Sequence, residues 1–177
     1  MIECFNFSST ITNEMQENAL KKINFLFSSD NWCKEVPNFQ TYSHLQEFEE
    51  FDIFVKTFVM SCKNYILKYK PKLQKDNNYV KMWCYHDNFH IQKRKAEQFG
   101  YKSYGRLWHK HSEKGAILSG VYFLQNSINE PTLFKDFKLL KATPFTWHIF
   151  TSNTYHSPPE TTNEKGRYTL AADFYIN

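Results

Sequence analysis

The apolar residues in the first part of the chain recur at helical spacing. The first stripe has a repeat of three or four positions and consists of Met15, Ala19, Ile23 and Leu26. Thr12 precedes it, and threonine is one of the residue types that cap helix N-termini. We therefore expect a helix that begins at Asn13.

A second and stronger helical stripe ends at Pro71. It consists of Phe51, Val55, Phe58, Cys62 and Tyr65. Ser43 and Gln46 have the spacing of a capping box, which predicts a helix start near Ser43. Proline disfavours helical backbone in the residue before it, so Lys70-Pro71 should end this helix.

After Pro71 the pattern changes to short runs rich in aromatic and β-branched residues, separated by polar turns. Such runs are typical of strands. The predicted strands are Val80–Tyr85, Arg106–His111, Ile117–Gln125, Trp147–Ser152 and Tyr168–Ile176. We expect an α+β fold in which a helical lead-in over residues 1–75 packs on a β core over 78–177, within one domain covering 1–177.

Composition and charge narrow the class of protein. Aromatic residues make up 18% of the 177 residues, which excludes a disordered chain. The net charge of 22 − 18 = +4 permits an acidic partner without requiring one. No apolar run approaches a membrane span of roughly 18 residues, and no basic stretch leads into an apolar segment at the N-terminus. We expect a cytoplasmic protein (host cytoplasm if viral) that makes no membrane contact and is a monomer or weak homodimer.

Candidate metal ligands are concentrated in the β half. On an extended strand His109, His111 and Glu113 would point to the same side, and His156 follows another aromatic run. Two histidines and one carboxylate suit iron(II), because they leave three of six positions open. We prefer His111, Glu113 and His156, since this frame supplies the carboxylate, with His109 as the alternate ligand. Arg167 lies eleven residues after His156, and arginine binds a carboxylate through two parallel hydrogen bonds.

These segments together resemble a known family. His111-Ser112-Glu113, the strand Ile117–Leu124, the segment Phe150–His156 and Arg167-Tyr168-Thr169 occur in the order found in phage and bacterial iron(II)/2-oxoglutarate oxygenases related to prolyl hydroxylases. The resemblance covers roughly residues 80 to 177. The order of the four segments is the most specific part of this resemblance, since each segment alone is a common sequence pattern.

The resemblance implies a double-stranded β-helix, also called a jelly-roll or cupin-like fold, with the N-terminal helices packed on one sheet. It implies a dioxygenase that uses Fe(II) and the co-substrate 2-oxoglutarate to hydroxylate or otherwise oxidise a substrate, with release of succinate and CO2. Arg167 would bind the far carboxylate of 2-oxoglutarate, and Thr169 would assist where the family has serine. We also expect Tyr122 in the cofactor-binding set, and the substrate pocket to include Trp108, Tyr104 and His86.

Two other functions remain open. One is a three-histidine, cupin-type dioxygenase that binds its metal through His109, His111 and His156 and does not use 2-oxoglutarate. The other is a non-enzymatic metal or nucleic-acid binding module, in which the basic run Gln92–Lys95 contacts phosphates. We expect a small-molecule or protein substrate, with a nucleic acid as the less favoured choice. The sequence contains no motif that identifies the substrate.

Overall fold

The largest sheet has five antiparallel strands in the order β1-β5-β3-β7-β2. Their bounds are β1 Ile2–Asn6, β2 Asn78–Asp87, β3 Leu118–Gln125, β5 Thr146–Thr151 and β7 Arg167–Ile176. A second, two-stranded sheet pairs β4 (Leu133–Phe134) with β6 (His156–Ser157). This computed structural model describes residues 1–29, 40–42, 44–100, 108–112, 115–125, 131–136, 141–160, 164 and 166–177.

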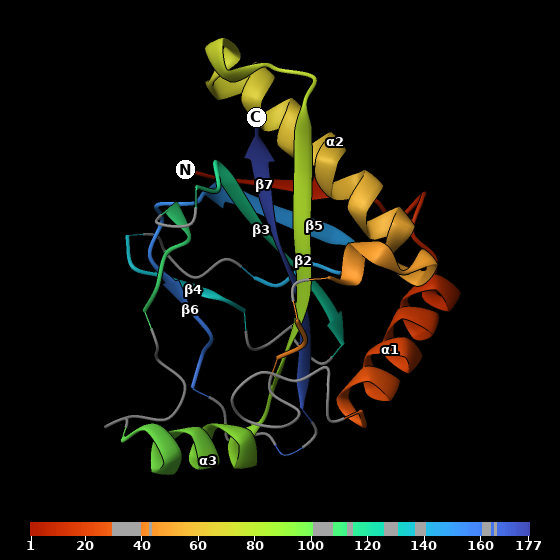
Figure 1. The fold of residues 1–177 in the computed structure, drawn as a ribbon, viewed down its shortest axis with the longest axis vertical. Helices are drawn as coiled ribbons and strands as arrows, with labels where there is room; N and C mark the ends of the chain where they lie inside the picture. Colours follow the sequence, from red (N-terminus) through yellow and green to blue (C-terminus); the bar gives the residue numbers. More distant parts are fainter. Residues whose placement is uncertain are drawn as a thin grey trace.

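Two helices cover one face of the five-stranded sheet, and the two-stranded sheet lies on the other side (Figure 1). The helices are α1 (Asn13–Phe27) and α2 (Asp52–Tyr69). Phe58 of α2 packs 4.9 Å from the ring of Trp147 on β5, and the Trp147 indole donates a hydrogen bond to Thr57. Because successive side chains of a strand point to opposite faces, each central strand contributes both to this core and to the opposite face.

The opposite face carries a smaller apolar cluster and the polar residues described below. Val121, Phe123 and Phe150 project from the large sheet toward Phe134 of β4. The rings of Phe134 and Phe150 lie 5.0 Å apart, edge to face. This cluster joins the two sheets and leaves the remaining positions on this face for polar side chains.

Several sequence predictions are confirmed. The first helix begins at Asn13, and the Thr12 side chain accepts a hydrogen bond from the backbone N–H of Met15. The second helix ends at Tyr69, before Lys70-Pro71. The last strand pairs with β3 in the same sheet.

The predicted start of the second helix is wrong. Ser43 lies outside the described residues, but α2 begins only at Asp52, after two short 3₁₀ turns (Leu45–Glu47 and Glu49–Phe51). The Gln46 side chain accepts a hydrogen bond from the backbone N–H of Met82 on β2. Its amide oxygen therefore covers part of the outer edge of the large sheet.

Four strands and helices were not predicted: the short strands β4 and β6, strand β1 and helix α3. Strand β1 precedes the first helix, within a segment that the sequence pattern assigned to a helical lead-in. Helix α3 (Phe89–Phe99) begins after its cap Asn88 and ends at Gly100, which adopts the left-handed conformation. The basic run Gln92–Lys95 lies on this helix and is only partly exposed to solvent, because Gln92 and Lys95 are buried.

Helix α2 packs tightly against the sheet at Gly120 of β3. A Cβ atom there would lie 2.7 Å from Phe58 and 2.8 Å from Ile149. We predict that Gly120→Ala lowers the free energy of unfolding by about 1–3 kcal/mol through overpacking. Urea denaturation measures this. The double variant Gly120→Ala/Phe58→Leu should cost less than the sum of the two single changes, and strict additivity would contradict the proposed contact.

Candidate metal centre

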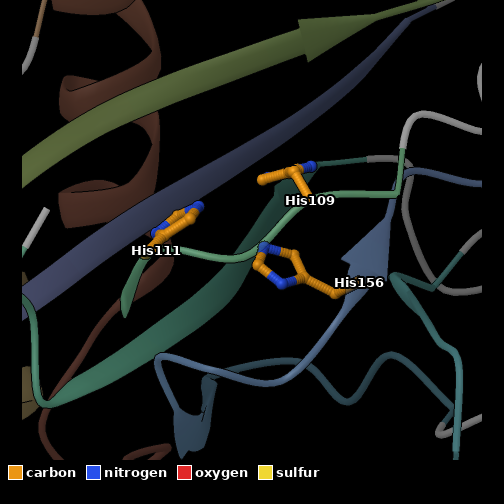
Figure 2. Close-up of side chains that lie close together, drawn as sticks. All are labelled: His109, His111 and His156. Atoms are coloured by element: carbon orange, nitrogen blue, oxygen red, sulfur yellow. The ribbon is translucent and has the colours of Figure 1, made fainter. Parts of the chain in front are cut away.

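Three histidines meet at the small sheet. The backbone of His109 exchanges two hydrogen bonds with that of His156, each 3.0 Å long. The backbone N–H of His111 donates to Ser152, which precedes β6 in the chain. These bonds place the segment carrying His109 and His111 beside the segment carrying His156, and Figure 2 shows the three side chains gathered between them.

The three side chains are close enough to bind one ion. Each contributes one ring nitrogen, and these three nitrogens all lie within 4.8 Å of one another. The ring centres are separated by 4.3 Å for His109 and His156, 5.2 Å for His109 and His111, and 5.0 Å for His111 and His156. His111 and His156 are buried, whereas His109 is exposed to solvent.

Hydrogen bonds to Nδ1 orient two of the rings. Nδ1 of His111 lies 2.7 Å from the carboxylate of Asp173, and Nδ1 of His156 lies 3.0 Å from the carbonyl oxygen of Thr154. Each acceptor holds a proton on Nδ1 and so leaves the Nε2 lone pair of that ring available to a metal. Metal-binding histidines usually have such partners.

The electrostatic environment keeps His156 neutral. Its pKa is lowered from the usual value of 6.5 to about 3, mainly by burial and also by the neighbouring His109 and His111, against the opposing effect of the Thr154 carbonyl. A neutral imidazole is the form that binds a metal. The site is therefore ready to bind a cation at neutral pH, without first losing a proton from His156.

The structure brings His109 and His111, which are two residues apart, together with His156. His111 and His156 converge as predicted, and the third side chain beside them is the alternate ligand His109. Glu113, the preferred carboxylate ligand, lies outside the described residues, so its role stays a prediction. Among the described residues, His109 is the third candidate ligand at the cluster.

Arg167 and Thr169 lie on the same face of β7 as Asp173, because they are separated from it by even numbers of residues. The Arg167 side chain is 2% exposed, donates to the hydroxyl of Thr132 over 3.1 Å, and lies 5.7 Å from the ring centre of Phe123. The Thr169 hydroxyl is buried without a hydrogen-bond partner among the described residues. A buried hydroxyl of this kind can bond to a ligand or a water molecule on this face of the sheet. Asp87, the buried cross-strand partner of Arg167 on β2, lies opposite the guanidinium-bearing residue.

Two predicted site residues lie on the wrong face of the sheet. The Tyr122 hydroxyl donates to Gln16 of α1, and its ring packs 5.2 Å from Phe54 of α2. The His86 ring stacks 4.1 Å from Tyr168, also on the helix-covered side. Strand alternation directs both side chains away from the histidines. Of the other predicted pocket residues, Trp108 adjoins His109 and is 42% exposed, and Tyr104 lies outside the described residues.

Sequence reasoning missed three residues that surround His111. Asp173 binds its Nδ1, Ser119 donates to Asp173 over 2.6 Å, and the Trp83 ring lies 5.5 Å from the imidazole. The period-two pattern of the last strand would have placed Asp173 on the Arg167 face. No comparable signal pointed to Trp83, since its contact with His111 depends on how the sheets pack.

The arrangement combines a cation site with an anion site. Three imidazole nitrogens can hold a divalent metal on one side and leave positions for exogenous ligands. On the same side of the sheet, Arg167 offers a planar donor to a carboxylate.

Comparison with solved structures identifies the fold. The chain aligns over 99% of its length with a prolyl 4-hydroxylase from Phytophthora capsici (TM-score 0.63, 10% identity), of which it spans 58%. It aligns with the non-heme alpha ketoglutarate dependent epimerase SnoN from nogalamycin biosynthesis (TM-score 0.68, 8% identity), covering 99% of this chain and 77% of that one. A collagen prolyl hydroxylase from Paramecium Bursaria Chlorella virus-1, solved with 2-oxoglutarate, gives a TM-score of 0.60 at 11% identity, with 99% and 96% coverage.

No protein-family model matches the chain, and no curated sequence matches it. At this level of identity the structural likeness concerns the fold alone, which this chain shares with the two prolyl hydroxylases and the epimerase. No helix within the described residues is both long and apolar enough to cross a membrane.

The two candidate ligand frames make opposite predictions. We expect His109→Ala to weaken Co(II) binding by more than about 100-fold, because a direct ligand should matter more than the hydrogen-bond partners of ligands, which contribute about 10- to 100-fold. Glu113→Ala should then retain most of the affinity. Isothermal titration with Co(II) measures both, and the reverse result would establish the His111–Glu113–His156 frame.

A fourth histidine on this face, His148 on β5, generates a pH prediction. It is 1% exposed, Nε2 has no hydrogen-bond partner among the described residues, and burial lowers its pKa from 6.5 to about 4. The unfolded chain binds a proton that the folded chain excludes. The contribution of His148 to the free energy of unfolding is therefore fully present above about pH 6.5. It is lost as the pH falls toward 4 and amounts to about 3 kcal/mol in total.

The measurement is urea denaturation of metal-free protein across this pH range, for the wild type and His148→Leu. The variant lacks this titration, so its stability should fall less steeply between pH 6.5 and pH 4. Parallel profiles for the two proteins would contradict the assignment.

Proposed function

We propose that the protein is an Fe(II)- and 2-oxoglutarate-dependent oxygenase that oxidises a substrate not yet identified. The observation that carries the proposal is the position of two sites on one side of one sheet. The histidine cluster and the buried pair Arg167 and Thr169 are linked through β7, because His111 is bonded to Asp173 of that strand. Structural neighbours of this fold include a protein solved with 2-oxoglutarate.

The donor set fits a ferrous ion. His109, His111 and His156 would hold it through ring nitrogens that converge within 4.8 Å, and imidazole is a ligand type that suits iron. Three protein ligands leave three of the usual six positions for exogenous groups. When bound, iron with the co-substrate would supply the activation of O2 that the amino acids cannot perform.

Arg167 and Thr169 fit the far carboxylate of the co-substrate. The guanidinium is planar and can donate two parallel hydrogen bonds, whereas the Thr169 hydroxyl needs a partner that the described residues do not provide. Thr132, which already accepts from Arg167, limits the orientations of that side chain. These residues would bind the far carboxylate of the keto acid.

The two sheets would form the opposed walls of a double-stranded β-helix within a single domain of 177 residues. Support comes from the order of the strands, the packing of Phe134 against Phe150, and the similarity to oxygenases of this fold. The two helices α1 and α2 then act as a support behind the large sheet. We propose a substrate that is a small molecule or a protein.

A second candidate function is a three-histidine dioxygenase that does not use 2-oxoglutarate. The observation in its favour is that, within the part of the chain that the structure describes, the third side chain at the cluster is His109. Such an enzyme has no need of a buried arginine on the face that carries the metal. Arg167 therefore favours the 2-oxoglutarate-dependent reaction and provides the test between the two.

We predict that Arg167→Ala weakens 2-oxoglutarate binding by about 10- to 100-fold, since a charge-assisted hydrogen bond contributes roughly 1.5–3 kcal/mol and each 1.4 kcal/mol is tenfold. Arg167→Lys should restore only part of the affinity, because an ammonium group cannot donate two parallel bonds. The measurement is anaerobic titration of the co-substrate into iron-loaded protein, followed by the metal-to-ligand charge-transfer band.

The matched control is Arg94→Ala on the exposed face of α3, which removes the same charge and should leave 2-oxoglutarate affinity unchanged. Iron affinity should change little in either variant. Absence of the absorption band in the wild type, or equal affinities for wild type and Arg167→Ala, would refute the use of 2-oxoglutarate.

A further inference from the structure

We propose that Asp173 supplies the negative charge that a three-histidine site lacks and that it acts on the metal through His111. It is a positioning residue, since it contacts a ligand and not the metal. This inference rests on the metal site of the proposed function. The hydrogen bond from His111 to Asp173 belongs to both ligand frames. The charge argument applies to the frame of His109, His111 and His156.

The contact is direct and well buried. Asp173 lies in the middle of the large sheet on β7, is 3% exposed, and has one carboxylate oxygen 2.7 Å from Nδ1 of His111. The same oxygen accepts a hydrogen bond of 2.6 Å from the hydroxyl of Ser119. Ser119 is the cross-strand partner of Asp173 on β3, so the register of the sheet itself sets this bond.

The charge of the site explains why a carboxylate is useful here. A metal held by two histidines and one carboxylate has one of its two positive charges offset by a ligand. Three neutral imidazoles offset none. Asp173 places one negative charge behind His111, where low exposure to solvent makes its effect on the metal stronger than at the surface.

The hydrogen bond also has a geometric effect. By accepting from Nδ1–H, the carboxylate selects the tautomer in which Nε2 of His111 is the lone-pair donor, and it makes that nitrogen more basic. Ser119 prevents the carboxylate from rotating away. The chain of contacts from Ser119 to Asp173 to His111 therefore orients a ligand and strengthens it at the same time.

A purely structural role for Asp173 predicts a different outcome. If the carboxylate only held the sheet together, its loss would loosen the site and weaken the binding of both metal and 2-oxoglutarate. If it supplies charge, its loss weakens the binding of the cation but removes a repulsion from the doubly negative co-substrate. The two affinities should then change in opposite directions.

The experiment compares Asp173→Asn with the wild type. Asparagine keeps the size and the acceptor oxygen but loses the charge. We expect the Co(II) dissociation constant to rise about 10- to 100-fold. In protein saturated with Fe(II) under anaerobic conditions, we expect 2-oxoglutarate to bind at least as tightly as in the wild type. Ser119→Ala should weaken Co(II) binding less than Asp173→Asn does.

The matched control is Asp76→Asn, which removes the same charge from an exposed position and should leave both affinities unchanged. Co(II) affinity of Asp173→Asn within about twofold of the wild type would overturn the proposal, and so would parallel weakening of both ligands. A wild type that binds Co(II) but not 2-oxoglutarate would refute the proposed function, while the cobalt comparison would still test Asp173.

A second measurement needs no variant at residue 173. Nitrogen-15 NMR of histidine-labelled, metal-free wild type should show His111 protonated on Nδ1 and bare on Nε2, with the resonance assigned through His111→Gln. A bare Nδ1 would overturn the proposal, because no proton would then join the ring to Asp173.

Discussion

The register of β7 determines which residues reach the candidate site. This strand lies between β3 and β2, so both of its edges are paired along the sheet. Its alternation sends Arg167, Thr169 and Asp173 to one face, and Leu170, Ala172 and Phe174 to the core beneath the helices. A slip of one residue would bury the charged set against α2 and expose the apolar set to the histidines. The anion site and the support for His111 therefore depend on the same pairing.

The two faces of the sheet have opposite energetic roles. The helix-covered face buries large apolar side chains such as Phe58 and Trp147, which stabilises the fold. The opposite face buries Arg167, Asp173 and the neutral histidines His148 and His156. Removing a polar group from water costs free energy unless that group is hydrogen-bonded. The apolar face offsets this cost. The polar face can consequently retain groups, such as the Thr169 hydroxyl, that have no hydrogen-bond partner among the described residues.

The sequence predicted those parts of the structure that depend on local periodicity. The stripes of both long helices and the alternation from Tyr168 to Ile176 are local patterns, and these elements are present. Strand β1 was missed because its five residues become a strand by pairing with β5, far away in the chain. Helix α3 was missed because its buried polar face is satisfied by tertiary contacts, such as the bond from Gln92 to Asp87. Period-two reasoning also places His109, His111 and Glu113 on one side together, so it could not choose between the two ligand frames.

The meeting of His111 and His156 has a consequence for the stability of the small sheet. The two residues are 156 − 111 = 45 positions apart, and β4 and β6 pair through only two residues each. A metal bound by both segments would be a cross-link that the unfolded chain lacks. Metal binding and folding of the small sheet would therefore be thermodynamically linked. The metal-free protein then has a stable half, the helix-backed sheet, and a weaker half. Local unfolding should begin at the small sheet, and the concentration of free metal ion would determine how often this sheet opens.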